Sequence, residues 1–87
     1  MARIGGELDQ LVQLRGVFDR QAEAVDDLTR TIRSQLSATS WDGPAADRFR
    51  QSWDSDFEPT LSRLRTALGD AATEVTRRRE ALIQAGG

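Results

Sequence analysis

Carboxylates are the residues of this chain whose types and spacing come closest to catalytic chemistry. Asp26 and Asp27 are adjacent, and Asp54, Asp56 and Glu58 alternate along one short segment. Paired carboxylates act as general acid and base only across a concave site, and on a helix they more often form a solvated face. The chain has no histidine or cysteine to serve as base, nucleophile or transition-metal ligand. The sequence therefore predicts a protein that is not an enzyme and needs no metal or cofactor.

The basic residues do not indicate nucleic-acid binding. All twelve are arginine, and the net charge is −2. The run Arg77, Arg78 and Arg79 spreads around a helix, because successive residues are about 100° apart, so we expect a structural role, with partner docking as the alternative. No apolar run approaches the roughly 20 residues of a membrane span, and the N-terminus lacks the apolar segment of a signal peptide. We expect no nucleic-acid partner and no direct membrane insertion.

Two long amphipathic segments must position whatever function the chain has. Apolar residues recur at steps of three and four, which predicts helices at about residues 6–38 and 44–84. The first stripe consists of Leu8, Leu11, Phe18, Val25, Ile32 and Leu36. The second consists of Phe49, Trp53, Phe57, Leu61, Leu64, Leu68, Val75 and Leu82. Because only a short turn, residues 39–43, joins the two helices, the sequence predicts an all-α antiparallel hairpin forming a single domain.

The turn has the residues that a helix corner requires. Pro44 suits the first turn of the second helix, and Gly43 permits a positive φ. Gly43 or Asp42 stands at the cap, and the Asp42 side chain can bond back to helix N–H groups. Trp41 can be a plug over the end of the hairpin or a recognition element, and the two roles are compatible. Further along, Pro59 costs about 3 kcal/mol inside a helix, yet the apolar stripe continues beyond it. We expect a kink near residues 55–59, with a true break as the alternative.

The apolar arc is wider than one seam between two helices needs. Leu14, Val17 and Leu28 form a second row beside the main stripe of the first helix. A face of that width indicates that further helices pack against it. The simplest closure is a four-helix bundle made of two hairpins, as a homodimer or a heterodimer. A monomer with scattered exposed aliphatic residues is the alternative.

The corner resembles the Trp-Xaa-Gly (WXG) family of hundred-residue type VII secretion proteins, early-secreted-antigen-like and of actinobacterial type. The matching run is Trp41-x-Gly43-x-x-Ala46-x-x-Phe49-x-x-x-Trp53. The resemblance implies antiparallel four-helix dimers and secretion without a signal peptide from the cytoplasm. It also implies recognition by a membrane machine with an FtsK-like ATPase, and it makes Trp41 and Gly43 the secretion motif.

One departure from the family pattern concerns the second half of its export signal. That half is a C-terminal Tyr-xxx-Asp/Glu motif, and this chain has no tyrosine; the nearest counterpart runs from Thr76 to Glu80. The chain is thus expected to be either a secreted substrate or the chaperone-like partner of one, in a heterodimer whose other subunit supplies the tyrosine. A homodimer remains an alternative. Another is a helical adaptor or targeting module that pairs with a larger toxin or effector.

Overall fold

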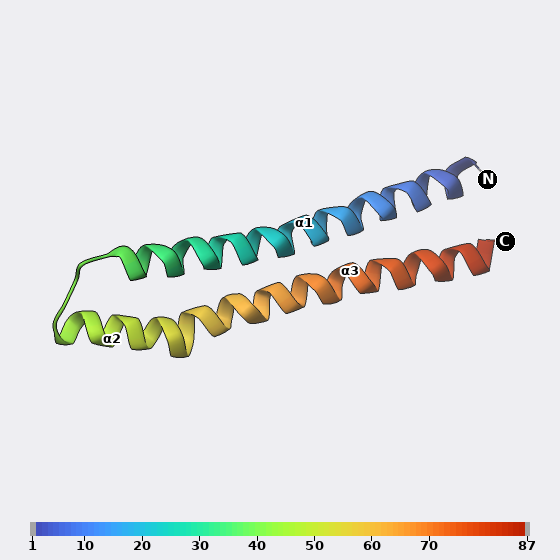
Figure 1. Ribbon diagram of the computed structural model, residues 1–87. Helices are drawn as coiled ribbons and strands as arrows, with labels where there is room; N and C mark the ends of the chain where they lie inside the picture. Colours follow the sequence, from blue (N-terminus) through green and yellow to red (C-terminus); the bar gives the residue numbers. More distant parts are fainter. Residues whose placement is uncertain (1, 87) are drawn as a thin grey trace.

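The chain folds as one all-helical hairpin. The computed structural model describes residues 2–86, with side chains from Gly6 onward. Its elements are α1 (Ala2–Ala38), α2 (Pro44–Ser52), the π-helical segment η1 (Trp53–Phe57) and α3 (Glu58–Gly86). The last three form one continuous rod that folds back along α1, so the two ends of the chain lie at the same end of the hairpin (Figure 1). The predicted all-α fold is confirmed.

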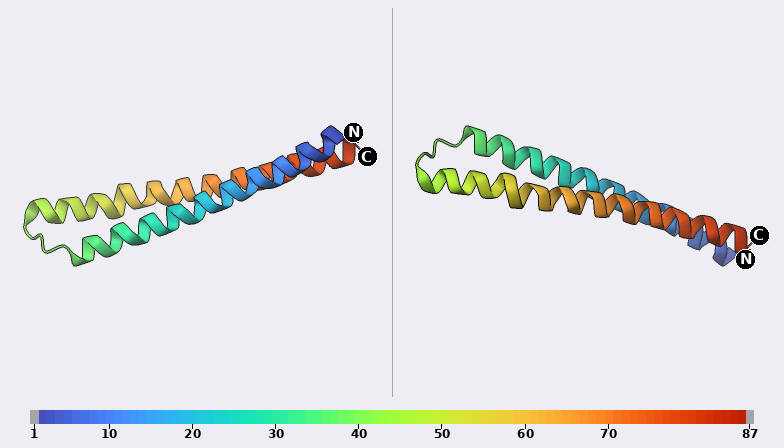
Figure 2. Two further views of the ribbon diagram at one scale, coloured as in Figure 1. Left: turned by 90° about the horizontal axis from the view of Figure 1, so that it is seen from above. Right: turned by 90° about the horizontal axis from the view of Figure 1, so that it is seen from below.

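The hairpin is a single layer of helices. It measures 65 × 18 × 11 Å, and the two views of Figure 2 show α1 and α3 running side by side and crossing near the open end. No helix within residues 2–86 is long and apolar enough to cross a membrane. A layer this thin can bury side chains only along the seam between α1 and the rod.

The first helix is longer than the sequence predicted. It begins at Ala2 instead of about residue 6, and Gly5 and Gly6 lie within it. A glycine costs about 1 kcal/mol relative to alanine inside a helix, which weakens a helix without ending it. At the other end, the Thr39 hydroxyl donates to the Gln35 carbonyl at 2.6 Å. This bond satisfies one of the carbonyls that a helix C-terminus leaves without a partner.

A π-helical segment stands where a kink near Pro59 was expected. The N–H of Glu58 donates to the carbonyl of Trp53, five residues back, and the helix then continues through Pro59. The Ser55 hydroxyl donates to the Gln51 carbonyl at 2.8 Å. Hydroxyl groups and the wider π turn thus carry the chain past the residue that lacks an N–H.

The core of the hairpin is small. Within residues 6–86, the buried apolar side chains are Ala22, Ala46, Trp53 and Ala72. The alanines let the helices approach closely, and Trp53 fills the seam near the corner. The remaining residues of the two predicted stripes that face the seam are only half-buried: Leu8, Leu11, Phe18, Val25, Ile32, Leu36, Leu61, Leu68, Val75 and Leu82.

Three residues predicted for the second stripe lie outside the seam. Phe49, Phe57 and Leu64 are on the surface of the hairpin, with 41%, 49% and 46% of their areas exposed. Steps of four separate Phe49, Trp53 and Phe57, and each such step overshoots a full helical turn by about 40°. Trp53 is buried in the seam, and the other two rings are turned away from it. Their place in the core of a dimer stays a prediction.

Candidate interaction site

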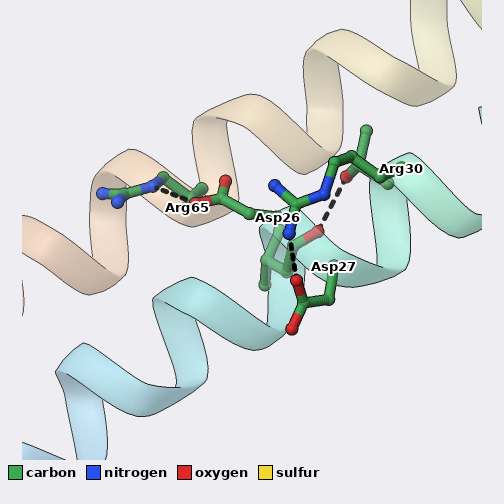
Figure 3. A network of polar contacts seen from close by, with 6 residues as sticks. Asp26, Asp27, Arg30 and Arg65 are labelled. Atoms are coloured by element: carbon green, nitrogen blue, oxygen red, sulfur yellow. Dashed lines mark hydrogen bonds and ion pairs between the residues drawn. The ribbon is translucent and has the colours of Figure 1, made fainter.

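One face of the hairpin carries the ionic contacts between its two arms. Arg65 of α3 reaches Asp26 of α1 with an N–O distance of 3.2 Å, as Figure 3 shows. Closer to the corner, Arg33 of α1 pairs with Glu58. We call this side of the molecule the polar face. Surface ion pairs of this kind contribute at most about 1 kcal/mol each, so they add little to the stability of the contact between α1 and the rod.

A shallow groove of about 630 Å³ runs along the polar face between α1, η1 and α3. The arginines that line it are each paired with an acid: Arg30 with Asp27, which Figure 3 also shows, Arg33 with Glu58 and Arg65 with Asp26. The candidate carboxylates thus serve as ion-pair partners or point to solvent. Among residues 2–86 there is no group of three acidic, histidine or cysteine side chains placed to hold a metal ion.

The other face is apolar. Among residues 6–86, seven of the nine large hydrophobic side chains that are exposed lie there, each between 41% and 49% exposed. We call this set the apolar face; its members are Leu14, Val17, Leu28, Trp41, Phe49, Phe57 and Leu64. The residues of the predicted second row are among them.

Helical geometry places these side chains on one side of the molecule. At about 100° per residue, Leu14, Val17 and Leu28 lie in one arc, rotated from the buried Ala22 in one sense. Leu64 is rotated from the buried Ala72 of α3 in the same sense. Because the two helices are antiparallel, equal rotations from the seam bring both rows to the same face. The residues of the two ion pairs between the arms, Arg65–Asp26 and Arg33–Glu58, are rotated in the opposite sense.

The α1 part of the apolar face carries no charge along its length. Continuing the steps of three and four, the row reads Gln10, Leu14, Val17, Gln21, Ala24, Leu28, Thr31 and Gln35. The charged residues of α1 from residue 9 onward lie outside this row. Burying an unpaired charge costs several kcal/mol, so a partner helix can cover this row without that penalty.

The corner extends the apolar face with aromatic rings. The ring centroids of Trp41 and Phe49 are 5.9 Å apart with an interplanar angle of 49°. Those of Phe49 and Phe57 are 6.3 Å apart at 38°. These separations fall in the range of favourable aromatic pairs. Trp41 is 42% exposed, so it packs on Phe49 and does not close the end of the hairpin as a buried plug.

The backbone of the corner depends on Gly43. Its φ is 108° and its ψ is 175°, a region that essentially only glycine occupies. Its carbonyl accepts a hydrogen bond from the N–H of Asp47 at 3.0 Å, and Pro44 follows in the first turn of α2. Gly43, one of the two residues expected at the cap, is the N-cap, and Asp42 does not cap the helix, since no side chain does so. The extended ψ of Gly43 and the proline start α2 without a side-chain cap.

Arg50 fixes the backbone of the corner, a role that was not predicted from the sequence. Its guanidinium donates to three carbonyls: Trp41 at 2.7 Å, Thr39 at 3.1 Å and Leu36 at 3.4 Å. These bonds tie α2 to the last turn of α1 and fix the backbone that carries Trp41. The planar fork of arginine suits such a cluster of acceptors. No local pattern signals contacts across nine to fourteen residues.

Comparisons of the chain with models of protein families, with curated proteins and with solved structures found no match.

Proposed function

We propose that this chain is a non-enzymatic interaction protein that pairs its apolar face with a second helical hairpin to form a four-helix bundle. The observation that carries the proposal is the gathering of seven half-exposed large hydrophobic side chains on one face. The uncharged row of α1 lies on the same face. Contiguous apolar patches of this kind mark interaction sites on soluble proteins.

The small core of the single hairpin supports the same proposal. In the part of the chain whose side chains are described, three of the four buried residues are alanines, and alanine buries little apolar area. Ordering each residue costs about 1–2 kcal/mol of conformational free energy, so a seam of this size leaves a single hairpin only marginally stable. A second hairpin would bury the exposed rings and leucines, and fully burying one such side chain contributes about 1.5–3 kcal/mol.

By its resemblance to the WXG proteins, we further propose that the dimer is a substrate, or the chaperone-like partner of a substrate, of a type VII secretion system. Trp41 is the residue we assign to recognition by the FtsK-like ATPase. Its exposure at a corner that Arg50 and Gly43 hold in one conformation supports this assignment. The lack of tyrosine favours a heterodimer whose other subunit supplies the tyrosine half of the signal.

Charge placed on the apolar face tests the pairing. The double variant Leu28→Glu with Leu64→Glu puts one carboxylate on each arm of that face. Its matched control is Val12→Glu, because Val12 is 52% exposed but is rotated toward the polar face. Light scattering after size exclusion, alone and after co-expression with the product of a neighbouring small open reading frame, should show a dimeric mass for the parent and for Val12→Glu. The double variant should be monomeric. A double variant that keeps the mass of the parent would refute the pairing.

A further inference from the structure

Two buried residues of the rod can face the seam together only if the helix between them holds one residue more than regular α-helical geometry allows. Trp53 is 7% exposed and Ala72 is 1% exposed, so both face the seam. In an uninterrupted α-helix of about 100° per residue, these two side chains would point about 100° apart. The π-helical segment lies between them. A π turn absorbs one extra residue, and with that residue taken out of the count the two side chains align.

The same extra residue aligns the outer side chains. Phe49 and Phe57 would point about 80° apart in an uninterrupted α-helix, but only about 20° apart with one residue absorbed. Their rings are 6.3 Å apart, which agrees with the second geometry. Leu64 follows Phe57 at a further rotation of only about 20°. The corner and α3 therefore share one apolar face because of the segment between them.

We propose that the extra residue in Trp53–Phe57 sets the rotation of the corner relative to α3. It directs Trp53 into the seam and brings Trp41 and Phe49 into line with Phe57 and Leu64 on the apolar face. The register is a property of the single hairpin, and its use by a partner helix rests on the proposed function. Single π turns inside α-helices are frequent at functional sites. Here the π turn lies between the corner that carries Trp41 and the part of the apolar face on α3.

Proline is the competing explanation for the π turn. Pro59 lacks the N–H that an α-helix would direct to the carbonyl of Ser55. If the proline alone caused the π turn, then Pro59→Ala would restore an uninterrupted α-helix and rotate Trp53 out of the seam. If the register requires the extra residue, Trp53 instead stays in the seam of Pro59→Ala, because Trp53 and Ala72 still need that residue to share the seam.

Changes of one residue in length separate these explanations. The background is Trp41→Phe with Pro59→Ala, in which Trp53 is the only tryptophan and no proline interrupts the rod. Three variants are then made: deletion of Ser55, insertion of one alanine after Ser55, and deletion of Thr73 in the regular part of α3. The measurements are acrylamide quenching of Trp53 fluorescence and thermal melting by circular dichroism.

The expected result is asymmetric. The background itself and the Ser55 deletion should keep Trp53 shielded, and the deletion should melt at or above the background, because it leaves a regular α-helix in the same register. The inserted alanine should raise the quenching constant severalfold and lower the melting temperature. Deletion of Thr73 should also lower it, because no π turn compensates there.

Several outcomes would overturn the proposal. Exposure of Trp53 in the background alone would assign the π turn to the proline. Equal damage from deletion and insertion would mean that the segment behaves as ordinary α-helix, and equal tolerance would mean that it is a loose joint. All these readouts belong to the single hairpin. A monomeric Ser55 deletion with a shielded Trp53 would therefore support the register while counting against the proposed pairing.

Discussion

Replacing Gly43 by alanine tests the corner most sharply. At φ 108° and ψ 175° an alanine is strained by about 1–3 kcal/mol. The added Cβ would have no neighbouring atom within 4 Å, so the whole effect is conformational and no steric clash contributes. For a domain of this size, 1 kcal/mol shifts the melting temperature by about 4–8 °C. We therefore expect Gly43→Ala to melt about 8–16 °C below the parent for a cost near the middle of that range.

Gly69→Ala is the matched control, because it adds the same methyl group inside α3. Its Cβ would meet only the Arg65 Nη1 atom, at 3.6 Å, an ordinary contact. Alanine is favoured over glycine in a helix by about 0.5–1 kcal/mol, so this variant should melt slightly above the parent. Melts are compared at one protein concentration, since the melting of a dimer depends on concentration. A Gly43→Ala protein that melts with the parent, while Gly69→Ala rises, would refute the assigned role of the glycine.

Four further substitutions separate structural from recognition roles. Trp53→Ala should destabilise the fold by about 3–5 kcal/mol, as loss of a buried aromatic does. Trp41→Ala should lower stability clearly less in a thermal melt, yet reduce export in a secretion assay. Equal losses of stability would make Trp41 chiefly a packing residue. Arg50→Lys keeps the charge but loses the planar fork, so we expect stability to fall by about 1–3 kcal/mol and amide exchange in residues 39–41 to become faster. Unchanged exchange there would contradict the role assigned to Arg50. Arg65→Gln breaks an exposed ion pair with α1 and should lower stability by less than about 1 kcal/mol. A larger loss in urea unfolding would mean that this pair contributes much of the stability of the contact between α1 and α3.

The hairpin could be predicted from the sequence because spacing and turn chemistry agree along the chain. With Arg15, Ala22 and Thr29 counted between its apolar residues, the row from Leu8 to Leu36 keeps steps of three and four, which fixes a helix face over its whole length. Gly43 and Pro44 mark the corner for independent reasons, one for its positive φ and the other for its fixed φ. The extra apolar row also predicted side chains that one seam cannot cover.

The π turn was missed although the sequence carries its signal. Phe49, Trp53, Phe57 and Leu61 follow one another at steps of four, and the drift of about 40° per step accumulates. That drift makes one continuous seam through all four residues impossible. The sequence shows the conflict, but which of the rings enters the seam depends on packing against α1. The role of Arg50 depends on where the chain reverses, so no spacing rule predicts it.

The central claim is that a partner hairpin covers the apolar face, and thiol labelling tests it most directly. The chain has no cysteine, so single replacements report one site each. Leu28→Cys lies on the apolar face and Val12→Cys toward the polar face, and the native side chains are 46% and 52% exposed in the single hairpin. In the native complex, whether homodimer or heterodimer, the thiol at residue 28 should react with a maleimide at least tenfold more slowly than the thiol at residue 12. In urea the two rates should become equal. Equal rates under native conditions would show an uncovered face and contradict the account.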